Sequence, residues 1–419
     1  MRLAWSAQCC SIAVQQWSFS IEDLSITPSP HDFSAVRSAM QRYVDQDILA
    51  GVSYAVLKGR DVLDVHCAGW ADKEAQTPLR TDHILRAMSN TKLVTTCAVL
   101  LLWEESKLGL DDAIEKYIPQ LANRQVLKPG ATRLDDTEPA HSSITIRHLL
   151  THSSGLSYGL LDPGTLMYKA YTERRVINPG LPLSRMMDNL AELPLLFHPG
   201  TSWEYSVSMD VLGYLVEVVS GQGLDSFFQS RIFDPLGMED TAFSLPAQKH
   251  ARIAACYNGA DAMNPMKPGL TRMDALPWRG AYLSPIPLLM GGGGLATTLP
   301  DMVALMRSLL PGGKTLLQPP TLDLMMRNQL PPGTHIQFPG FGEIRGKGHG
   351  LGGAVTLQPS SLDPQNSTGE FQWGGMAGTH WWISPKTGLV GVLMAQRNLG
   401  FWNPFAFEFK QRVYQAVGA

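Results

Sequence analysis

The sequence is poor in cysteine and has no pair of cysteines at metal-binding spacing. Five cysteines occur among 419 residues, at positions 9, 10, 67, 97 and 256, and no C-x-x-C is present. An odd number without such spacing argues against a disulfide framework and against a zinc site, so we expect reduced thiols.

The chain also lacks an excess of charge of either sign and a long apolar run. Lys and Arg number 34 against 37 Asp and Glu, which gives a net charge of −3. Nucleic acid and other polyanions are therefore not expected as partners. The longest apolar run, near residues 98–103, is far shorter than the roughly 20 residues that cross a bilayer, so we expect no membrane span.

Residues 1–30 are interpreted as an N-terminal extension. Arg2 precedes a weakly apolar stretch, as in a signal peptide, but Gln8 interrupts that stretch and no A-x-A cleavage site follows. We therefore expect a cytoplasmic protein, with a periplasmic or secreted location as the alternative if this segment is a signal. Nothing in the sequence indicates the oligomeric state.

Both ends of the chain show the same pattern, a helix and an antiparallel hairpin. Residues 31–47 have helical spacing of apolar residues, and 51–70 read as two strands around a turn at 58–61. Residues 378–396 read as a second hairpin and 404–417 as an amphipathic helix. The strands do not alternate with helices, which argues against a doubly wound parallel sheet.

We therefore predict an α+β fold in which both chain ends build one antiparallel sheet flanked by helices. Residues 31–88 and 346–419 would form this α/β domain. Residues 89–345, which are mostly helical with long loops, would form an inserted domain.

Two serines are candidates for a nucleophile. Ser157 lies in a literal G-x-S-x-G at 155–159, a motif that requires a strand before the serine and a helix after it. Here a helix with Thr145 as its N-cap precedes the motif and a turn follows, so this context is missing. Ser89 stands instead where a long apolar helix begins, running to about residue 106.

Ser89 and Lys92 form an S-x-x-K pair. Residues three apart share one face of a helix, and the helix N-terminus favours negative charge. A serine hydroxyl needs a base within hydrogen-bond reach, and a lysine serves as that base only when burial or nearby charge lowers its pKa. An N-cap serine beside a solvated lysine gives the same pattern, so the pair alone is a weak signal.

Several further motifs strengthen the catalytic interpretation of the S-x-x-K pair, because together, in their order along the chain, they resemble one superfamily. M-S-N-T-K-L-V-T-T (88–96) and H-L-L-T-H-S-S-G-L-S-Y-G (148–159) resemble the serine β-lactamases and penicillin-binding proteins. The match is closest to the class C β-lactamase-like group and its family VIII carboxylesterase branch. It extends over about residues 35–415 and includes the segments 200–221, 233–243, 291–305 and 373–396.

The resemblance implies a β-lactamase-like fold with an active site between the two domains. It assigns Ser89 as the nucleophile that becomes acylated, with Lys92 and Tyr205 as general base and proton relay. A phenol held beside an ammonium ion ionises more easily than a free one, which suits a relay. The backbone N–H groups of Ser89 and Met376 would form the oxyanion hole.

Two positions depart from the β-lactamase pattern. The family's Tyr-x-Asn reads Tyr205-Ser206-Val207 here, and its K-T-G strand reads Trp373-Gly374-Gly375 at the start of a strand. W-G-G is a mark of the esterase branch. A literal K-T-G does occur at 386–388, but it falls in a hairpin turn and is interpreted as a chance match.

These departures favour a neutral ester as the substrate. Val207 replaces a polar side chain and Trp373 replaces a lysine, so partners for an anionic amide are lost and apolar surface is gained. With Gly374 and Gly375, these two residues are expected to line the substrate pocket, where the glycines allow close approach to the backbone. We predict a carboxylesterase acting on short-to-medium acyl esters, a small-molecule substrate, without cofactor or metal.

Several alternatives stay open. Parts of the chain resemble lovastatin-type acyltransferases of the same fold, and a β-lactamase or D-Ala peptidase-like enzyme is a second alternative. Weak β-lactam hydrolysis, above all of cephalosporins, would be a side activity of the esterase. The remaining alternative is a relative that binds ligands without turnover, which the presence of Ser89, Lys92 and Tyr205 argues against.

Other features have a weaker connection with chemistry. His148 and His152 are four apart, a spacing that suits a metal on one helix face, but no H-E-x-x-H is present. G-G-G-G (291–294) is followed by no G-K-[ST] and is interpreted as a flexible lead into a helix near residue 300. Tryptophans 381, 382 and 402 are expected either to line the acyl or alcohol pocket or to pack in the core.

Overall fold

The computed structural model describes residues 24–275, 277–338 and 342–418. Residues 1–23, which make up most of the predicted N-terminal extension, lie outside the described part. The prediction about a signal segment concerns these residues and is therefore not tested. The helices of the described part include none with the length and apolar composition that crossing a membrane requires. The cytoplasmic location stays a prediction.

An eight-stranded antiparallel sheet is the centre of the fold, in the order β12-β13-β14-β15-β16-β1-β2-β3. The central strands β1 and β16 come from opposite ends of the chain and pair with Tyr54 opposite Leu393. The bounds of the strands are β1 Gly51–Lys58, β2 Asp61–Asp72, β3 Thr77–Pro78, β12 Lys347–His349, β13 Ala354–Thr356, β14 Phe371–Gly375, β15 Thr379–Ile383 and β16 Leu389–Ala395.

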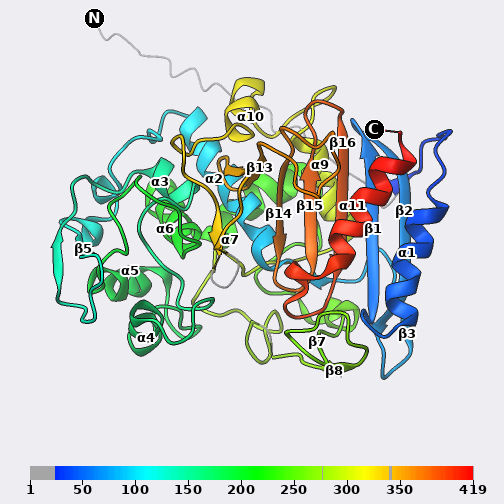
Figure 1. Cartoon of the computed structure of the whole chain (residues 1–419), viewed down its shortest axis with the longest axis horizontal. Helices are drawn as coiled ribbons and strands as arrows, with labels where there is room; N and C mark the ends of the chain where they lie inside the picture. The colour runs from blue at the N-terminus through cyan, green and yellow to red at the C-terminus, as the bar shows by residue number, and fades with distance from the viewer. Residues whose placement is uncertain (1–23, 276, 339–341, 419) are drawn as a thin grey trace, which may run out of the picture.

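Two helices cover one face of this sheet. Figure 1 shows α1 (Ser34–Asp45) and α11 (Pro404–Ala416) side by side in front of the strands, and both helices pack into one hydrophobic core. The other face packs against α2 (Thr91–Glu104) and α9 (Leu299–Ser308) in a larger core. Because both faces are covered, seven of the eight residues of β1 are buried, as in a central strand.

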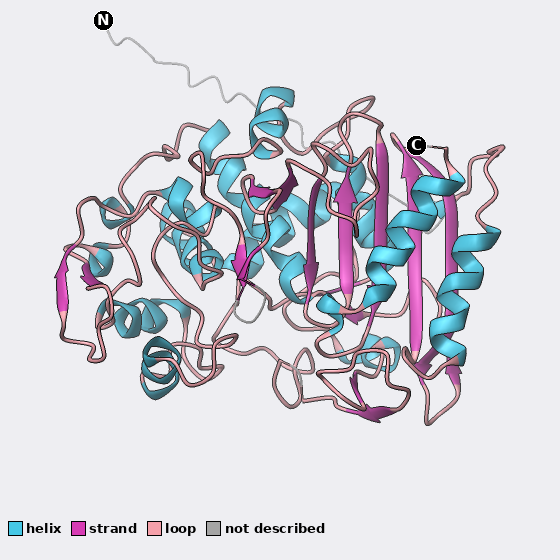
Figure 2. Cartoon of the chain, viewed as in Figure 1, coloured by secondary structure: helices cyan, strands magenta, loops and turns pink. Residues whose placement is uncertain are grey.

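The remaining helices belong to the middle of the chain, and Figure 2 shows most of them beside the sheet. Their bounds are α3 Ile146–Leu150, α4 Leu166–Glu173, α5 Leu183–Ala191, α6 Ser208–Ser220, α7 Leu224–Phe228, α8 Asp234–Leu236 and α10 Pro319–Met325. Four short two-stranded sheets accompany them: β4 (Leu85–Arg86) with β9 (Ala296–Thr297), β5 (Gln125–Leu127) with β6 (Thr137–Pro139), β7 (Tyr257–Gly259) with β8 (Leu270–Arg272), and β10 (Gln337–Phe338) with β11 (Gly342–Glu343).

The predicted fold class is confirmed: both chain ends build one antiparallel sheet, and a mostly helical segment is inserted between them. One boundary differs. Trp373-Gly374-Gly375 ends β14 instead of beginning it, because the strand already starts at Phe371 through pairing with β13.

Candidate active site

Ser89 lies in a tight turn between the sheet and the inserted helices. Met88–Asn90 form a single 3₁₀ turn, and α2 follows directly from Thr91. Met88 has φ +48°, a left-handed conformation that costs a residue with a side chain roughly 1–2 kcal/mol. Strain of this kind concentrates at functional sites, where the surroundings hold it in place. Here it positions Ser89 at the N-terminal end of α2.

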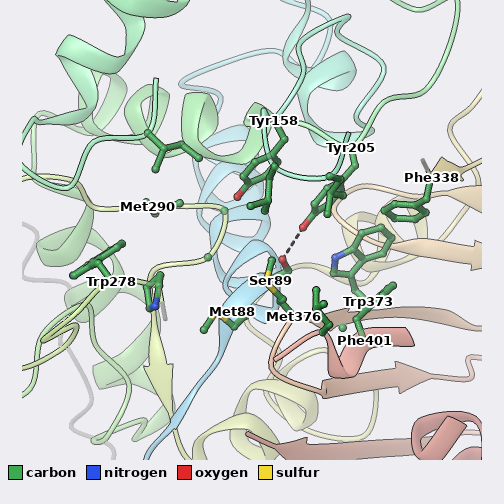
Figure 3. Close-up of a pocket in the computed structure, with 18 of the residues that line it drawn as sticks. Met88, Ser89, Tyr158, Tyr205, Trp278, Met290, Phe338, Trp373, Met376 and Phe401 are labelled. Atoms are coloured by element: carbon green, nitrogen blue, oxygen red, sulfur yellow. Dashed lines mark hydrogen bonds between the residues drawn. The ribbon is translucent and has the colours of Figure 1, made fainter. Parts of the chain in front are cut away.

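The Ser89 hydroxyl contacts two other polar side chains. Its Oγ lies 2.6 Å from the Tyr205 hydroxyl oxygen, and Lys92 Nζ donates to the same Oγ at 3.3 Å. Figure 3 shows the Ser89–Tyr205 contact across the centre of a pocket. The three residues singled out in the sequence as nucleophile, base and relay are thus brought together.

Lys92 is held by a glycine segment from far along the chain. Its Nζ donates to the Gly292 carbonyl at 2.5 Å, while the Gly292 N–H donates to Asp210 Oδ1 at 3.0 Å. Burial raises the pKa of the Asp210 carboxyl, and the nearby Lys92 charge opposes that shift. A Cβ at Gly292 would lie 2.7 Å from Asp210 Oδ2, so only glycine fits there without displacement.

Tyr205 precedes α6 and is fixed between other aromatic rings. Its ring stacks on Tyr158 with a centroid distance of 5.4 Å and on Trp373 at 5.7 Å. Lys92 Nζ lies 4.7 Å from the centroid of the same ring, which adds a cation–π attraction. These contacts hold the Tyr205 ring while its hydroxyl contacts Ser89.

Ser89 and Tyr205 line a cavity of about 360 Å³. No charged side chain of the described part of the chain lines it, and most of its wall is aromatic or aliphatic. Such a cavity suits a neutral, mainly apolar small molecule. The wall consists of Met88, Ser89, Tyr158, Leu160, Leu161, Ile177, Pro179, Tyr205, Pro277, Trp278, Met290, Gly292, Gly293, Phe338, Trp373, Gly374, Met376, Leu399 and Phe401.

The residues expected in the substrate pocket fall into two groups. Trp373 and Gly374 line the cavity, and so does Met376, which was expected in the oxyanion hole. Val207 does not: it is 0% exposed in the core at the start of α6, and its N–H donates to the Ser157 carbonyl. Gly375 is also absent from the wall. It lies against Thr379, Ala87 and Met88, and a Cβ there would be 2.7 Å from the Ala87 carbonyl oxygen.

The literal G-x-S-x-G contributes a different residue from the one that the motif suggests. Ser157 is fully buried, and its backbone N–H donates to the Tyr171 hydroxyl. The next residue, Tyr158, is the one that reaches the cavity and stacks on Tyr205. The literal K-T-G lies in the turn between β15 and β16, where Thr387 donates to the Ser384 hydroxyl.

Sequence reasoning missed four contributors to the site. Gly292, Asp210 and Phe338 are brought in by tertiary contacts, and Tyr158 stood next to a serine that drew attention away from it. The G-G-G-G segment is also not a flexible lead. Gly291 accepts from Thr95 Oγ1 at 2.7 Å, and Gly292 bridges Lys92 and Asp210.

The two histidines considered for a metal do not share a helix face. His148 caps α3, where its Nδ1 accepts from the Thr145 N–H. His152 lies beyond the helix end with φ +56°, and its Nδ1 pairs with the Ser206 hydroxyl at 3.0 Å. Elsewhere Glu138, His141 and His198 cluster, but the two imidazoles stack at 3.6 Å, so their in-plane lone pairs do not converge on one ion.

Comparisons with known proteins show the family of the chain. The family model described as Beta-lactamase matches residues 36–405. The chain is 34% identical to the Lovastatin esterase of Penicillium rubens, over 80% of this chain and 84% of that protein. It is 29% identical to the Esterase EstB of Burkholderia gladioli, over 91% of this chain and 96% of that protein.

A solved structure of an enzyme has the same architecture. "EstCE1, a hydrolase with promiscuous acyltransferase activity" superposes with a TM-score of 0.76 and 26% identity, covering 90% of this chain and 97% of that one. Hydrolysis and acyl transfer are thus both found on this fold among similar proteins.

Proposed function

The chain belongs to the beta-lactamase family, and on that premise we propose that it is a carboxylesterase acting through an acyl group carried on Ser89. The esterases among its relatives support a hydrolase. The observation that carries the finer proposal is the placement of Ser89 Oγ 2.6 Å from the Tyr205 hydroxyl and 3.3 Å from Lys92 Nζ, at the wall of an uncharged cavity.

Acylation begins with attack of Ser89 Oγ on the ester carbonyl carbon. Tyr205 acts as the phenolate, which the Lys92 ammonium stabilises. The phenolate oxygen takes the hydroxyl proton of Ser89 as the Oγ–carbon bond forms. The backbone N–H groups of Ser89 and Met376 hold the oxyanion of the tetrahedral intermediate. Each donor of this kind is worth about 3–4 kcal/mol in the transition state.

Collapse of the intermediate breaks the bond between the carbonyl carbon and the alkoxy oxygen. Tyr205 returns its proton to this oxygen, and the alcohol leaves. Water then attacks the acyl-Ser89 carbonyl by the same steps in reverse order, which releases the carboxylic acid and restores the serine hydroxyl.

The substrate class follows from the wall of the cavity. No described side chain in the wall carries a charge that would bind the carboxylate of a β-lactam, and Trp373 lies on the strand that edges the cavity. A neutral ester of a short-to-medium acyl group needs no such partner, and its alkoxide leaves more easily than a lactam nitrogen. We propose such esters as the preferred substrates.

We also propose the boundaries of two units that place the site between them. Residues 31–88 with 346–419 form the sheet-containing unit, and residues 89–345 form the other. Thr379 of β15 donates to the Ala87 carbonyl at 3.0 Å, which ties the sheet to the turn that carries Ser89.

The experiment compares Ser89→Ala with Ser157→Ala on p-nitrophenyl butyrate. We expect Ser89→Ala to lose the burst and the turnover, because no acyl group can form. Ser157→Ala should keep near-normal rates, because its hydroxyl is buried away from the cavity. The opposite pattern would refute the assignment, and a fluorophosphonate adduct on Ser89, detected as intact mass, separates an enzyme from a ligand-binding relative.

Acyl transfer to an alcohol is the second candidate, favoured by the activity named for the similar EstCE1 structure. Adding an alcohol acceptor to the p-nitrophenyl butyrate assay and measuring the new ester distinguishes the two outcomes. Nitrocefin in the same panel reports β-lactam hydrolysis.

A further inference from the structure

A second cavity, of about 430 Å³, lies next to the one that contains Ser89. Phe338, Trp373 and Phe401 belong to the walls of both cavities. Their ring centroids are 6.1–6.5 Å apart in every pair, close enough for the rings to touch. Figure 3 shows all three on the same side of the Ser89–Tyr205 pair, so these rings are the partition between the two cavities.

Beyond the partition, the wall is built by the sheet and by α11. Trp381 and Trp382 of β15 and Ala406 of α11 line this cavity, together with Ile336 and Leu362. These two tryptophans, which the sequence suggested either for an acyl or alcohol pocket or for the core, border this cavity and are buried in the cores of the sheet. The side chain of the third, Trp402, lies outside the described part of the chain.

The cationic side chains that reach this cavity are already paired. Lys347 Nζ lies 2.7 Å from Asp363 Oδ1, and Lys410 Nζ lies 2.9 Å from Glu370 Oε2 and 2.5 Å from Gln372 Oε1. Because each of these two ammonium groups is already paired with a carboxylate, neither lysine needs a bound anion as a partner. Apart from these paired groups and Glu343, Ser360, Gln372 and His380, the wall is aromatic or aliphatic, which suits a neutral apolar group.

The position of the partition indicates which half of an ester would enter. In the proposed mechanism Tyr205 returns its proton to the alkoxy oxygen, so the alcohol half must lie on the Tyr205 side of Ser89. Phe338 and Trp373 are each 5.7 Å from the Tyr205 ring, centroid to centroid. The second cavity thus begins directly behind the place where the alcohol half would lie.

We propose that the second cavity binds the distal part of the alcohol half of the ester and makes the enzyme selective for elongated apolar alcohols. A rotation of the Phe338 ring would join the two cavities into one channel. This inference rests on the proposed esterase function and adds to it the substrate class on the alcohol side.

The test uses esters with one acyl group and different alcohols: methyl, butyl and octyl butyrate, followed by acid release. We expect the wild-type kcat/KM for the octyl ester to exceed that for the methyl ester by about tenfold or more. Ala406→Phe fills the second cavity from α11 and should lower this octyl-to-methyl ratio about tenfold. Ala416→Phe, on the same helix outside the cavity, is the matched control and should keep the ratio.

An unchanged ratio in folded Ala406→Phe, or a wild-type ratio near one, overturns the proposal. If Ala406→Phe does not fold, as judged by circular dichroism, Phe338→Ala decides. Removing the ring opens the partition and should raise the octyl-to-methyl ratio, and a ratio that stays or falls overturns the proposal.

Calorimetry with octan-1-ol separates failure of this inference from failure of the esterase proposal. We expect octan-1-ol to bind wild type, to bind Ala406→Phe several-fold more weakly, and to bind Ala416→Phe like wild type. If no butyrate ester is hydrolysed but this pattern holds, the esterase proposal is refuted and the alcohol site stands. If esters are hydrolysed but the three proteins bind octan-1-ol equally, the alcohol site is refuted.

Discussion

At the scale of single residues, the proposed chemistry depends on one hydroxyl group more than on the ring that carries it. Tyr205 contributes its ring to an aromatic stack and its oxygen to Ser89, and these two contributions can be separated. Tyr158, stacked on Tyr205 at an interplanar angle of 12°, gives a matched comparison because it lines the same cavity.

Tyr205→Phe keeps the stack and removes the proton relay. We expect kcat/KM for p-nitrophenyl butyrate to fall by about 10²–10⁴-fold, the usual range for a general acid–base group. Tyr158→Phe should cost less than about tenfold, because no step of the proposed mechanism uses its hydroxyl. Equal losses in the two variants would contradict the assignment of the relay to Tyr205.

Single residues also differ in how far the sequence could predict them. Ser89 and Lys92 are three apart on one element, so their contact follows from local spacing. Tyr205 required the resemblance, because 116 residues separate it from Ser89 and no local rule links the two. The prediction that Val207 lines the pocket is wrong. At the start of α6, a shift of one position in the sequence decides whether a side chain faces the cavity or the core.

At the scale of elements, the glycine segment before β9 positions the ammonium group of Lys92. Gly292 accepts a hydrogen bond from Lys92 and donates one to Asp210, so its peptide planes determine where the ammonium group lies. Periodicity could not reveal this role, because a run of glycines has no side-chain pattern. The contacts that define it come from residues 92 and 210, on two separate helices.

Gly292→Ala should disturb Lys92 without touching Ser89 or Tyr205. Its Cβ would lie 2.7 Å from Asp210 Oδ2, whereas the nearest atom to a Cβ at Gly293 is 3.9 Å away. We expect Gly292→Ala to lower kcat about tenfold or more, and Gly293→Ala to lower it far less, because misplacement by about 1 Å is costly in catalysis. Burst kinetics of both variants check this, and the reverse order would contradict it.

Strand β12 contributes a pH dependence of stability. His349 is buried beside His152 and Trp373, and burial lowers its pKa to about 4. Between pH 6.5 and 4, His349 is therefore protonated in the unfolded chain but stays largely neutral in the folded chain. The free energy of unfolding should fall by about 3 kcal/mol over this range as the pH is lowered.

His349→Gln removes this titration and should flatten the fall in stability. Urea unfolding at pH 7, 5.5 and 4.5 measures it. His141→Gln, at an exposed histidine, is the control and should keep the wild-type slope. An identical slope in His349→Gln and wild type would refute the contribution of β12.

At the scale of the whole molecule, stability depends on contacts between the two ends of the chain. Phe409 of α11 is 0% exposed and packs 4.9 Å from the Tyr54 ring of β1 and 5.3 Å from the Trp382 ring, centroid to centroid. The core under α1 and α11 takes residues from both ends of the chain, so it exists only when both ends are in place.

Phe409→Ala should lower the free energy of unfolding by about 3–5 kcal/mol, the usual cost of a large cavity in a core. Gln415→Ala, at an exposed position of the same helix, should change it by less than about 0.5 kcal/mol. Denaturant unfolding followed by tryptophan fluorescence checks both. A loss below about 1 kcal/mol in Phe409→Ala would show that α11 is dispensable for this core.

The whole fold was more predictable than its second cavity. Residues 51–72 and 379–395 each contain two largely apolar segments around a polar turn, so their strands and their antiparallel pairing could be predicted. The partition of Phe338, Trp373 and Phe401 joins three elements that are distant in sequence, and no pattern in any one of them indicates a shared wall.

The pairing of β1 with β16 also sets the order of events during synthesis. Lys58 and Leu389 face each other across the sheet but are 331 positions apart in the chain. At about 5–20 residues per second, a ribosome makes β1 some tens of seconds before its partner exists. Until β16 is made, the edge of β1 that pairs with it stays unpaired. Ser89 also emerges long before β14, so esterase activity can arise only after nearly the entire chain has been translated.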